Sequence, residues 1–90
     1  MKIMEKMIFG AVIYRRLNKK TGKCYIGSTD NEKRRNAQWK DLKNRYAGRK
    51  VEEARRQFDL ADFEYEVLEV ITSTDKNYLK RRMVERESYY

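Results

Sequence analysis

Apolar and β-branched side chains dominate residues 8–17 and return along residues 23–27, and each run has the length of a strand. The residues between the two runs are Asn, Lys, Thr and Gly, which favour turns. Two short apolar runs separated by such residues are typical of a β-hairpin. The chain is therefore predicted to begin with two antiparallel strands.

The facing pairs in this hairpin depend on its loop. A four-residue loop, residues 18–21, would place Tyr14 directly opposite Tyr25, with Lys23 and Gly27 on the same face. Side chains that face each other across two strands have Cβ atoms about 4.5–5.5 Å apart, so the two phenols would stand side by side. For the tyrosines alone, the simpler interpretation is an aromatic pair that stabilises the sheet.

The polar sequence after the hairpin predicts two helices. Asp30 or Asn31 can cap a first helix that runs to about Tyr46, and Gly48 provides a stop signal. A shorter helix is expected over residues 50–58. The connection is short, so both helices belong to the same compact unit.

A third strand and a last helix complete the pattern. Residues 63–71 begin with alternating apolar and acidic side chains, which predicts a strand, and Ser73 or Thr74 can cap a helix that continues to the end. The order is β-β-α-α-β-α. The expected fold class is a single small α/β domain over residues 1–90, with a three-stranded antiparallel sheet flanked by helices.

Composition narrows the class of protein. The chain has 90 residues, of which 40% are hydrophobic and 40% charged, so it can fold as one domain. Its apolar runs fall short of the roughly 20 residues that span a membrane, and charges interrupt the N-terminal segment, so neither a membrane span nor secretion is expected. Cys24 is the one cysteine and histidine is absent, which excludes an internal disulfide and a His/Cys zinc site. A cytoplasmic location fits.

The net charge of +8 is unevenly distributed. Residues 33–56 contain ten Lys or Arg against three acidic residues, whereas residues 59–75 contain six acidic residues and no basic one. A basic region of this kind is a sequence-independent footprint for nucleic acid, because it releases the counterions of the phosphates. A solvated helix face explains the charge alone equally well.

Two charged residues lie on apolar helix faces. Arg35 begins a stripe that continues at the helical spacing through Trp39, and Glu87 follows Leu79 and Met83 at intervals of four. An unpaired charge on such a face costs several kcal/mol, so each needs a partner, a metal or a cleft. A structural ion pair between Arg35 and Glu87, or fraying of the last turn, is the alternative to a functional site.

These residues carry a resemblance to the GIY-YIG nuclease family. The first family motif corresponds to Val12-Ile13-Tyr14, and the second to Tyr25-Ile26-Gly27, eleven residues later. Arg35 follows the second motif by eight residues, as the family arginine does, and Glu87 lies where the family has its catalytic glutamate. The resemblance covers nearly the whole chain and implies the fold order given above.

What the resemblance implies is a metal-dependent DNA endonuclease, a hydrolase of phosphodiester bonds. Tyr14 would act as general base or orient the attacking water, with Tyr25 beside it and Lys23 as a nearby cation, because a phenol with a pKa of about 10 is a poor base at neutral pH. Arg35 would bind phosphate oxygens, and Glu87 would hold one Mg²⁺ or Mn²⁺ ion. Residues expected to bind the DNA substrate are Gly27, which would admit the phosphate backbone, and Arg34, Lys40, Lys43 and Arg45.

The chain departs from the family pattern at three places. Val12 replaces the first motif glycine, and Trp39 stands where many relatives have a histidine. The family usually has an asparagine beyond the glutamate, whereas this sequence stops at Tyr90, so the expectation of a domain truncated at its C-terminus stays open. A catalytically impaired nucleic-acid-binding module of the same fold is therefore the alternative function. A basic structural or protein-interaction domain without nucleic-acid affinity is a third. Site recognition is expected from a separate DNA-recognition domain outside this chain.

Overall fold

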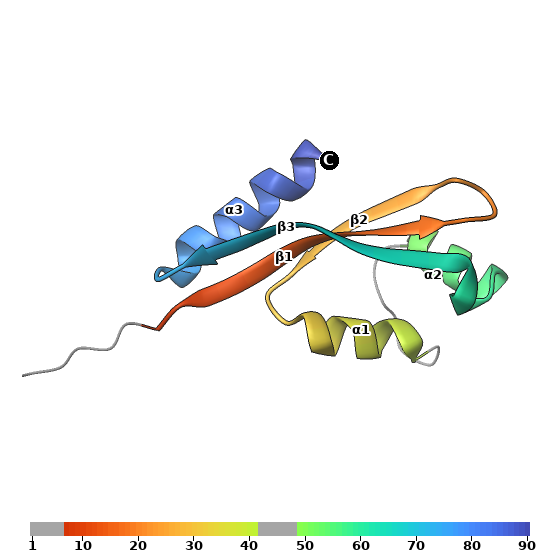
Figure 1. Cartoon of the computed structure of the whole chain (residues 1–90), viewed down its shortest axis with the longest axis horizontal. Coiled ribbons are helices and arrows are strands. Elements are labelled where there is room, and N and C mark those ends of the chain that lie inside the picture. Colours follow the sequence, from red (N-terminus) through yellow and green to blue (C-terminus); the bar gives the residue numbers. More distant parts are fainter. Residues whose placement is uncertain (1–6, 42–48) are drawn as a thin grey trace, which may run out of the picture.

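The computed structural model describes residues 7–41 and 49–90, which form a three-stranded antiparallel sheet with helices (Figure 1). The elements follow the chain in the order β1 (Phe9–Asn18), β2 (Cys24–Thr29), α1 (Glu32–Lys40), α2 (Arg49–Gln57), a 3₁₀ turn η1 (Leu60–Asp62), β3 (Phe63–Ser73) and α3 (Lys76–Tyr89). The predicted fold class, a small α/β domain of order β-β-α-α-β-α, is confirmed.

The sheet has the strand order β2-β1-β3, so β1 is central and β2 forms one edge. β1 pairs antiparallel with both neighbours over most of its length. The pairing with β3 shifts register between Ile13 and Tyr14, where Leu68 is the extra residue of β3. Such a bulge increases local twist. The open edge at β2 matters for the site described below.

The hairpin turns later along the chain than the expected loop of residues 18–21, because β1 runs to Asn18 and β2 begins at Cys24. The Asn18 amide donates to the Lys23 carbonyl at 2.9 Å, and the Asn18 side chain accepts from the backbone amide of Lys20. Gly22 takes φ of 76°, a left-handed conformation that glycine adopts without steric cost. The facing pairs therefore differ from the prediction by two positions.

This shift corrects one predicted pair. Tyr14 faces Gly27 across the strands, and Tyr25 faces Arg16, so the prediction that the two tyrosines stand directly opposite each other was wrong. A shift of two residues preserves the face of every side chain, because the pleat has a period of two. Tyr14 and Tyr25 consequently remain on one face of the sheet.

Two helix boundaries also differ from the sequence prediction. α1 ends at Lys40, because Asp41 is already extended at φ −91° and ψ 98°, so this helix is shorter than predicted at this point. Tyr46 itself lies outside the described residues. The N-cap of α3 is Asp75, whose carboxylate accepts from the amide of Tyr78, rather than Ser73 or Thr74.

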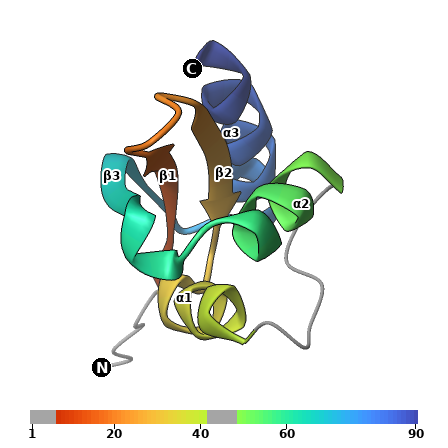
Figure 2. The ribbon, with the colours of Figure 1, turned by 90° about the vertical axis from the view of Figure 1, so that its right-hand side faces the viewer.

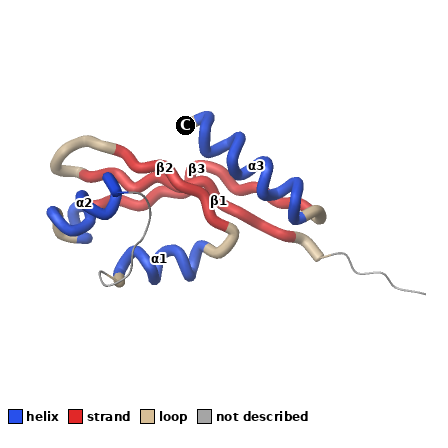
Figure 3. Tube along the Cα trace, turned by 180° about the vertical axis from the view of Figure 1, so that it is seen from behind, coloured by secondary structure: helices blue, strands red, loops and turns tan. Residues whose placement is uncertain are grey.

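Helices cover both faces of the sheet, with α3 on one side and α1 on the other (Figures 1 and 3). Under α3 lies an aliphatic cluster that consists of Ala11, Ile13, Ile71 and Leu79. On the opposite face, Tyr14 and Trp39 are buried together, and Val51 of α2 packs against them. Figure 2 shows the three strands between these helices in end view.

No helix in the described part of the chain is long and apolar enough to cross a membrane.

Candidate active site

A pocket of about 180 Å³ lies at the open edge of the sheet and brings together most of the site residues expected from the sequence. Its lining contains Tyr14, Tyr25, Gly27, Arg35 and Glu87, and also Arg16, Ile26, Ser28 and Val51. These side chains come from β1, β2, α1, α2 and α3. Because β2 is an edge strand, the pocket can collect groups from both faces of the sheet.

Tyr14 reaches the pocket by lying across Gly27. A Cβ atom added to Gly27 would come within 2.5 Å of the Tyr14 hydroxyl and 2.6 Å of its ring, so a larger residue would displace the phenol. Tyr14 is buried, and its hydroxyl accepts a hydrogen bond from Nε of Arg35 at 3.3 Å. The sequence suggested that Gly27 makes room for phosphate. Instead the Tyr14 side chain occupies that space.

Glu87 enters the pocket from the other face of the sheet. Its Oε2 accepts a hydrogen bond from the Ser28 hydroxyl at 2.9 Å, and in the described part of the chain it forms no ion pair with Arg35. The alternative of a structural Arg35–Glu87 pair is therefore wrong. Glu85, on the same helix, is exposed and pairs with Arg82 at 2.7 Å. The choice of Glu87 as the inward carboxylate agrees with this geometry.

Arg16 is a pocket residue that the sequence reasoning missed. Only 4% of it is exposed, and its guanidinium lies 4.3 Å from the centre of the Trp39 ring and 4.8 Å from that of Tyr65. It also donates to the side-chain oxygen of Asn36 at 2.7 Å. The signal was present, because Arg16 is two residues after Tyr14 and must share its face. Stacking on two rings keeps this cation desolvated next to the pocket.

Trp39 belongs to the core and not to the pocket. Its ring meets the edge of Phe63 at 5.0 Å between centroids, and it covers Arg16. Trp39 therefore supplies no group to the pocket.

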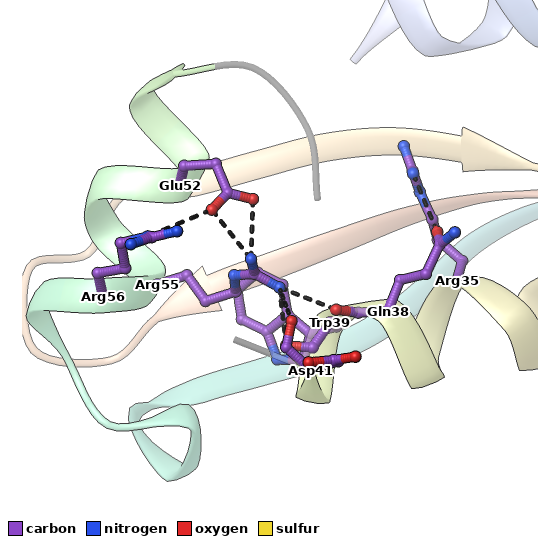
Figure 4. Close-up of polar contacts among 7 residues, drawn as sticks. All are labelled: Arg35, Gln38, Trp39, Asp41, Glu52, Arg55 and Arg56. Atoms are coloured by element: carbon purple, nitrogen blue, oxygen red, sulfur yellow. Dashed lines mark hydrogen bonds and ion pairs between the residues drawn. The ribbon is translucent and has the colours of Figure 1, made fainter. Parts of the chain in front are cut away.

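Arg55 holds the end of α1, as Figure 4 shows. It is 1% exposed, donates from Nη1 to the backbone oxygens of Gln38, Trp39 and Asp41, and donates from Nη2 to the Glu52 carboxylate at 2.9 Å. These oxygens are the carbonyls that a helix leaves unsatisfied at its C-terminus. Arg55 is thus a structural cation, and the basic region of residues 33–56 is not a uniform surface for DNA.

Tyr65 packs against the Tyr14 ring at 5.6 Å between centroids and fixes the start of α1. Its hydroxyl donates to Oε2 of Glu32 at 3.0 Å. Burial, together with the hydrogen bond to Glu32 and the negative charge of Glu32, raises the pKa of Tyr65 to about 12. Tyr65 is therefore a neutral hydrogen-bond donor at physiological pH and a poor candidate for a base.

Several expected residues lie outside the pocket. Lys23 is exposed and lines a neighbouring hollow, so the structure does not place it against Tyr14. Arg34 is exposed beside the pocket in a second hollow, and Lys40 is exposed at the end of α1. Lys43 and Arg45 lie outside the described residues. The compact part of the expected site is therefore Tyr14, Tyr25, Gly27, Arg35 and Glu87.

The donor atoms in the pocket suit a hard divalent cation. They include the Glu87 carboxylate and the hydroxyls of Ser28, Tyr14 and Tyr25, all of which are oxygens, the ligand type that Mg²⁺ and Mn²⁺ prefer. Among the described residues, no cluster of three or more Asp, Glu, His or Cys could hold a metal. Glu87 would thus hold such an ion with water and substrate oxygens as further ligands, a set that fits Mg²⁺.

Comparison of the chain with protein-family models, with curated proteins and with solved structures gives no match.

Proposed function

We propose that this chain is a metal-dependent endonuclease domain that hydrolyses phosphodiester bonds in DNA, as its resemblance to the GIY-YIG nucleases implies. The observation that carries the proposal is the pocket at the edge of β2. It gathers Tyr14, Tyr25, Gly27, Arg35 and Glu87 from separate elements, and these are the residues that the family motifs single out. Their position around one pocket supports the proposal.

The pocket offers the groups that phosphodiester hydrolysis requires. The planar guanidinium of Arg35 binds two non-bridging phosphate oxygens, which a lysine at this position would hold less well. Tyr14, held by Arg35 and by the gap at Gly27, orients the attacking water or takes its proton. The buried charge of Arg16 behind the Tyr14 ring, 5.3 Å from its centre, adds positive potential where negative charge develops.

Glu87 would hold the metal ion, and Ser28 orients the Glu87 carboxylate through their hydrogen bond. A single Mg²⁺ or Mn²⁺ ion would supply positive charge for the phosphoryl oxygens and the leaving oxygen. The pocket of about 180 Å³ is smaller than the sites that enclose drug-sized molecules, roughly 300–1,000 Å³.

The test is Glu87→Gln, assayed by cleavage of supercoiled plasmid with Mg²⁺ or Mn²⁺ and with EDTA as the metal-free control. Glutamine preserves size and can still accept from Ser28, so DNA binding and the melting temperature should stay close to those of the unchanged protein. Cleavage should fall by about 100-fold or more, in line with the loss of one charge-stabilising group. Glu85→Gln is the matched control, because Glu85 is exposed on the same helix and should tolerate the change.

Cleavage by Glu87→Gln at the unchanged rate would contradict the metal site. If the unaltered chain binds DNA in a salt-dependent manner but cuts with neither metal ion, the endonuclease proposal fails, and the catalytically impaired binding module replaces it. Absence of salt-dependent DNA binding would remove both functions.

A further inference from the structure

A second hollow of about 280 Å³ adjoins the candidate active site. It lies between α1 and α3, and Ser28 and Arg35 line both it and the first pocket. The two hollows therefore adjoin at these two side chains. A linear ligand bound at Arg35 in the first pocket can extend into the second.

The second hollow carries an excess of positive charge. Arg34 and Arg35 from α1 and Lys80 from α3 line it, against the single carboxylate of Asp30. Within the described residues, Arg34 and Lys80 form no ion pair. Other cations are already paired, such as Arg15 with Glu66 and Arg86 with Glu69. The charges of Arg34 and Lys80 are thus available to an external anion.

The opposite end of the active site differs in charge. Beyond Tyr25 and Val51 lies a third hollow of about 870 Å³, whose charged lining residues, among those the structure describes, are Lys23 and Glu53. One cation and one anion balance each other at this end within the described residues. The described lining is therefore cationic in the second hollow and balanced in the third.

We infer that the second hollow is a subsite for the phosphate next to the one that is cut, held by Arg34 and Lys80, so that the DNA strand is gripped by charge on one side of the cut only. The inference rests on the proposed function, because it takes the first pocket as the site of the scissile phosphate. A nucleic-acid strand carries one negative charge per nucleotide, so occupation of the first pocket brings an adjacent phosphate within reach of the second.

Thymidine dinucleotides test this inference without knowledge of a target sequence. TpT carries the central phosphodiester alone, pTpT adds a phosphate on the 5′ side, and TpTp adds one on the 3′ side. Each competes in EDTA against a fluorescent single-stranded oligonucleotide for the protein. Only one of pTpT and TpTp should compete about tenfold better than TpT, the gain expected when a charged hydrogen-bonded contact is added.

Substitutions test whether Arg34 and Lys80 are the source of the tenfold gain in competition. In Arg34→Gln with Lys80→Gln, the preferred dinucleotide should compete no better than TpT. Lys33→Gln with Lys76→Gln is the matched control, because both are exposed lysines on the same helices outside the hollow, and it should keep the tenfold gain. Equal gains for pTpT and TpTp, no gain for either, or a gain that survives in the first variant would overturn the inference.

The experiments distinguish failure of the phosphate subsite from failure of the endonuclease function. If the chain cuts plasmid and loses cutting in Glu87→Gln, but shows no one-sided gain, only the subsite is refuted. If it never cuts plasmid yet shows the one-sided gain and its loss in Arg34→Gln with Lys80→Gln, the phosphate subsite stands and the endonuclease function falls.

Discussion

The helices α1 and α3 each deliver one principal side chain to the pocket, Arg35 and Glu87, but they are attached to the sheet in different ways. α3 lies on an aliphatic cluster through Leu79 and Met83, and this packing is non-directional. α1 is held at both ends by side-chain hydrogen bonds, from Tyr65 to its first turn and from Arg55 to its last. A polar helix with one buried aromatic residue, Trp39, is thus positioned by a few directional contacts in addition to that one apolar anchor.

The two attachments should respond differently to substitution and to pH. Hydrogen bonds fail when one partner is removed or changes its protonation state, whereas aliphatic packing does not titrate. α3 also has titratable contacts with the sheet, and among them Arg86 donates to Glu69 of β3 at 2.7–2.9 Å. Substitutions at Arg55, Tyr65 and Glu69 therefore separate the two modes of attachment.

Arg55→Ala should have the largest effect. It removes the donor from three backbone carbonyls at the end of α1 and leaves the Glu52 carboxylate without its buried partner. The free energy of unfolding should fall by about 3–5 kcal/mol, measured by urea denaturation. Arg55→Lys should restore little of it, because one ammonium cannot reproduce the planar set of donors.

Arg56→Ala is the control for this change, because the Arg56 side chain is 62% exposed and lies on the next position of α2. It should shift the free energy of unfolding by no more than about 0.5 kcal/mol. A similar loss in both variants would show that α2 as a whole, and not the Arg55 contacts, holds α1.

Tyr65→Phe should have an intermediate effect at neutral pH, a loss of about 1–2 kcal/mol for the hydrogen bond to Glu32. Its pH dependence is more specific. The pKa of Tyr65 is raised to about 12 in the folded protein, from an unfolded value of about 10. The stability due to this contact is therefore complete below pH 10 and is lost as pH rises to about 12.

The measurement is the difference in unfolding free energy between the unaltered chain and Tyr65→Phe across this range. The difference should shrink as pH rises from 10 to 12, and a difference that stays constant would exclude the contact as its source. Because the difference is taken, alkaline effects common to both proteins cancel.

Glu69→Gln should have the smallest effect and the opposite pH dependence. The hydrogen bonds from Arg86 lower the pKa of Glu69 in the folded protein. The contact therefore stabilises the fold above the unfolded carboxyl pKa, and that stability is lost as pH falls through the lowered folded value. Thermal melting across acid pH should show the unaltered protein and Glu69→Gln converging. An effect as large as that of Arg55→Ala would contradict the view that aliphatic packing holds α3.

The fold was predictable because its signals are local. The alternation of residues 63–67 and the turn residues after β1 specify strands and a hairpin whatever the rest of the chain does. The exact facing pairs of the hairpin were not predictable from the sequence. They depend on the position of the turn, where the Asn18 side chain accepts a hydrogen bond from the backbone amide of Lys20. The end of α1 was missed for a related reason: Arg55, far along the chain, satisfies the last carbonyls of the helix.

The candidate site, like the fold, was predictable only where local patterns determine it. The inward positions of Arg35 and Glu87 came from helical periodicity, and both side chains line the pocket. Ser28 and Arg16 were missed, although the period of two along β1 already placed Arg16 beside Tyr14. Lys23 was expected next to Tyr14 on face alone, but distance along the strand separates them. The periodicity of a helix or strand predicts the side on which a side chain lies. The distance between two side chains and their hydrogen-bond partners depend on the folded structure.

Residues 14 and 27, thirteen positions apart in the sequence, constrain each other in evolution. The Tyr14 side chain fills the space in which a Cβ atom of residue 27 would lie. A lineage of this protein cannot enlarge residue 27 while it keeps a bulky ring at residue 14, because both would occupy the same few cubic ångströms. Residue 14 can therefore become smaller alone, whereas residue 27 can become larger only after residue 14 has become smaller. A homologous sequence with a larger residue at position 27 is therefore expected to have a smaller residue than tyrosine at position 14.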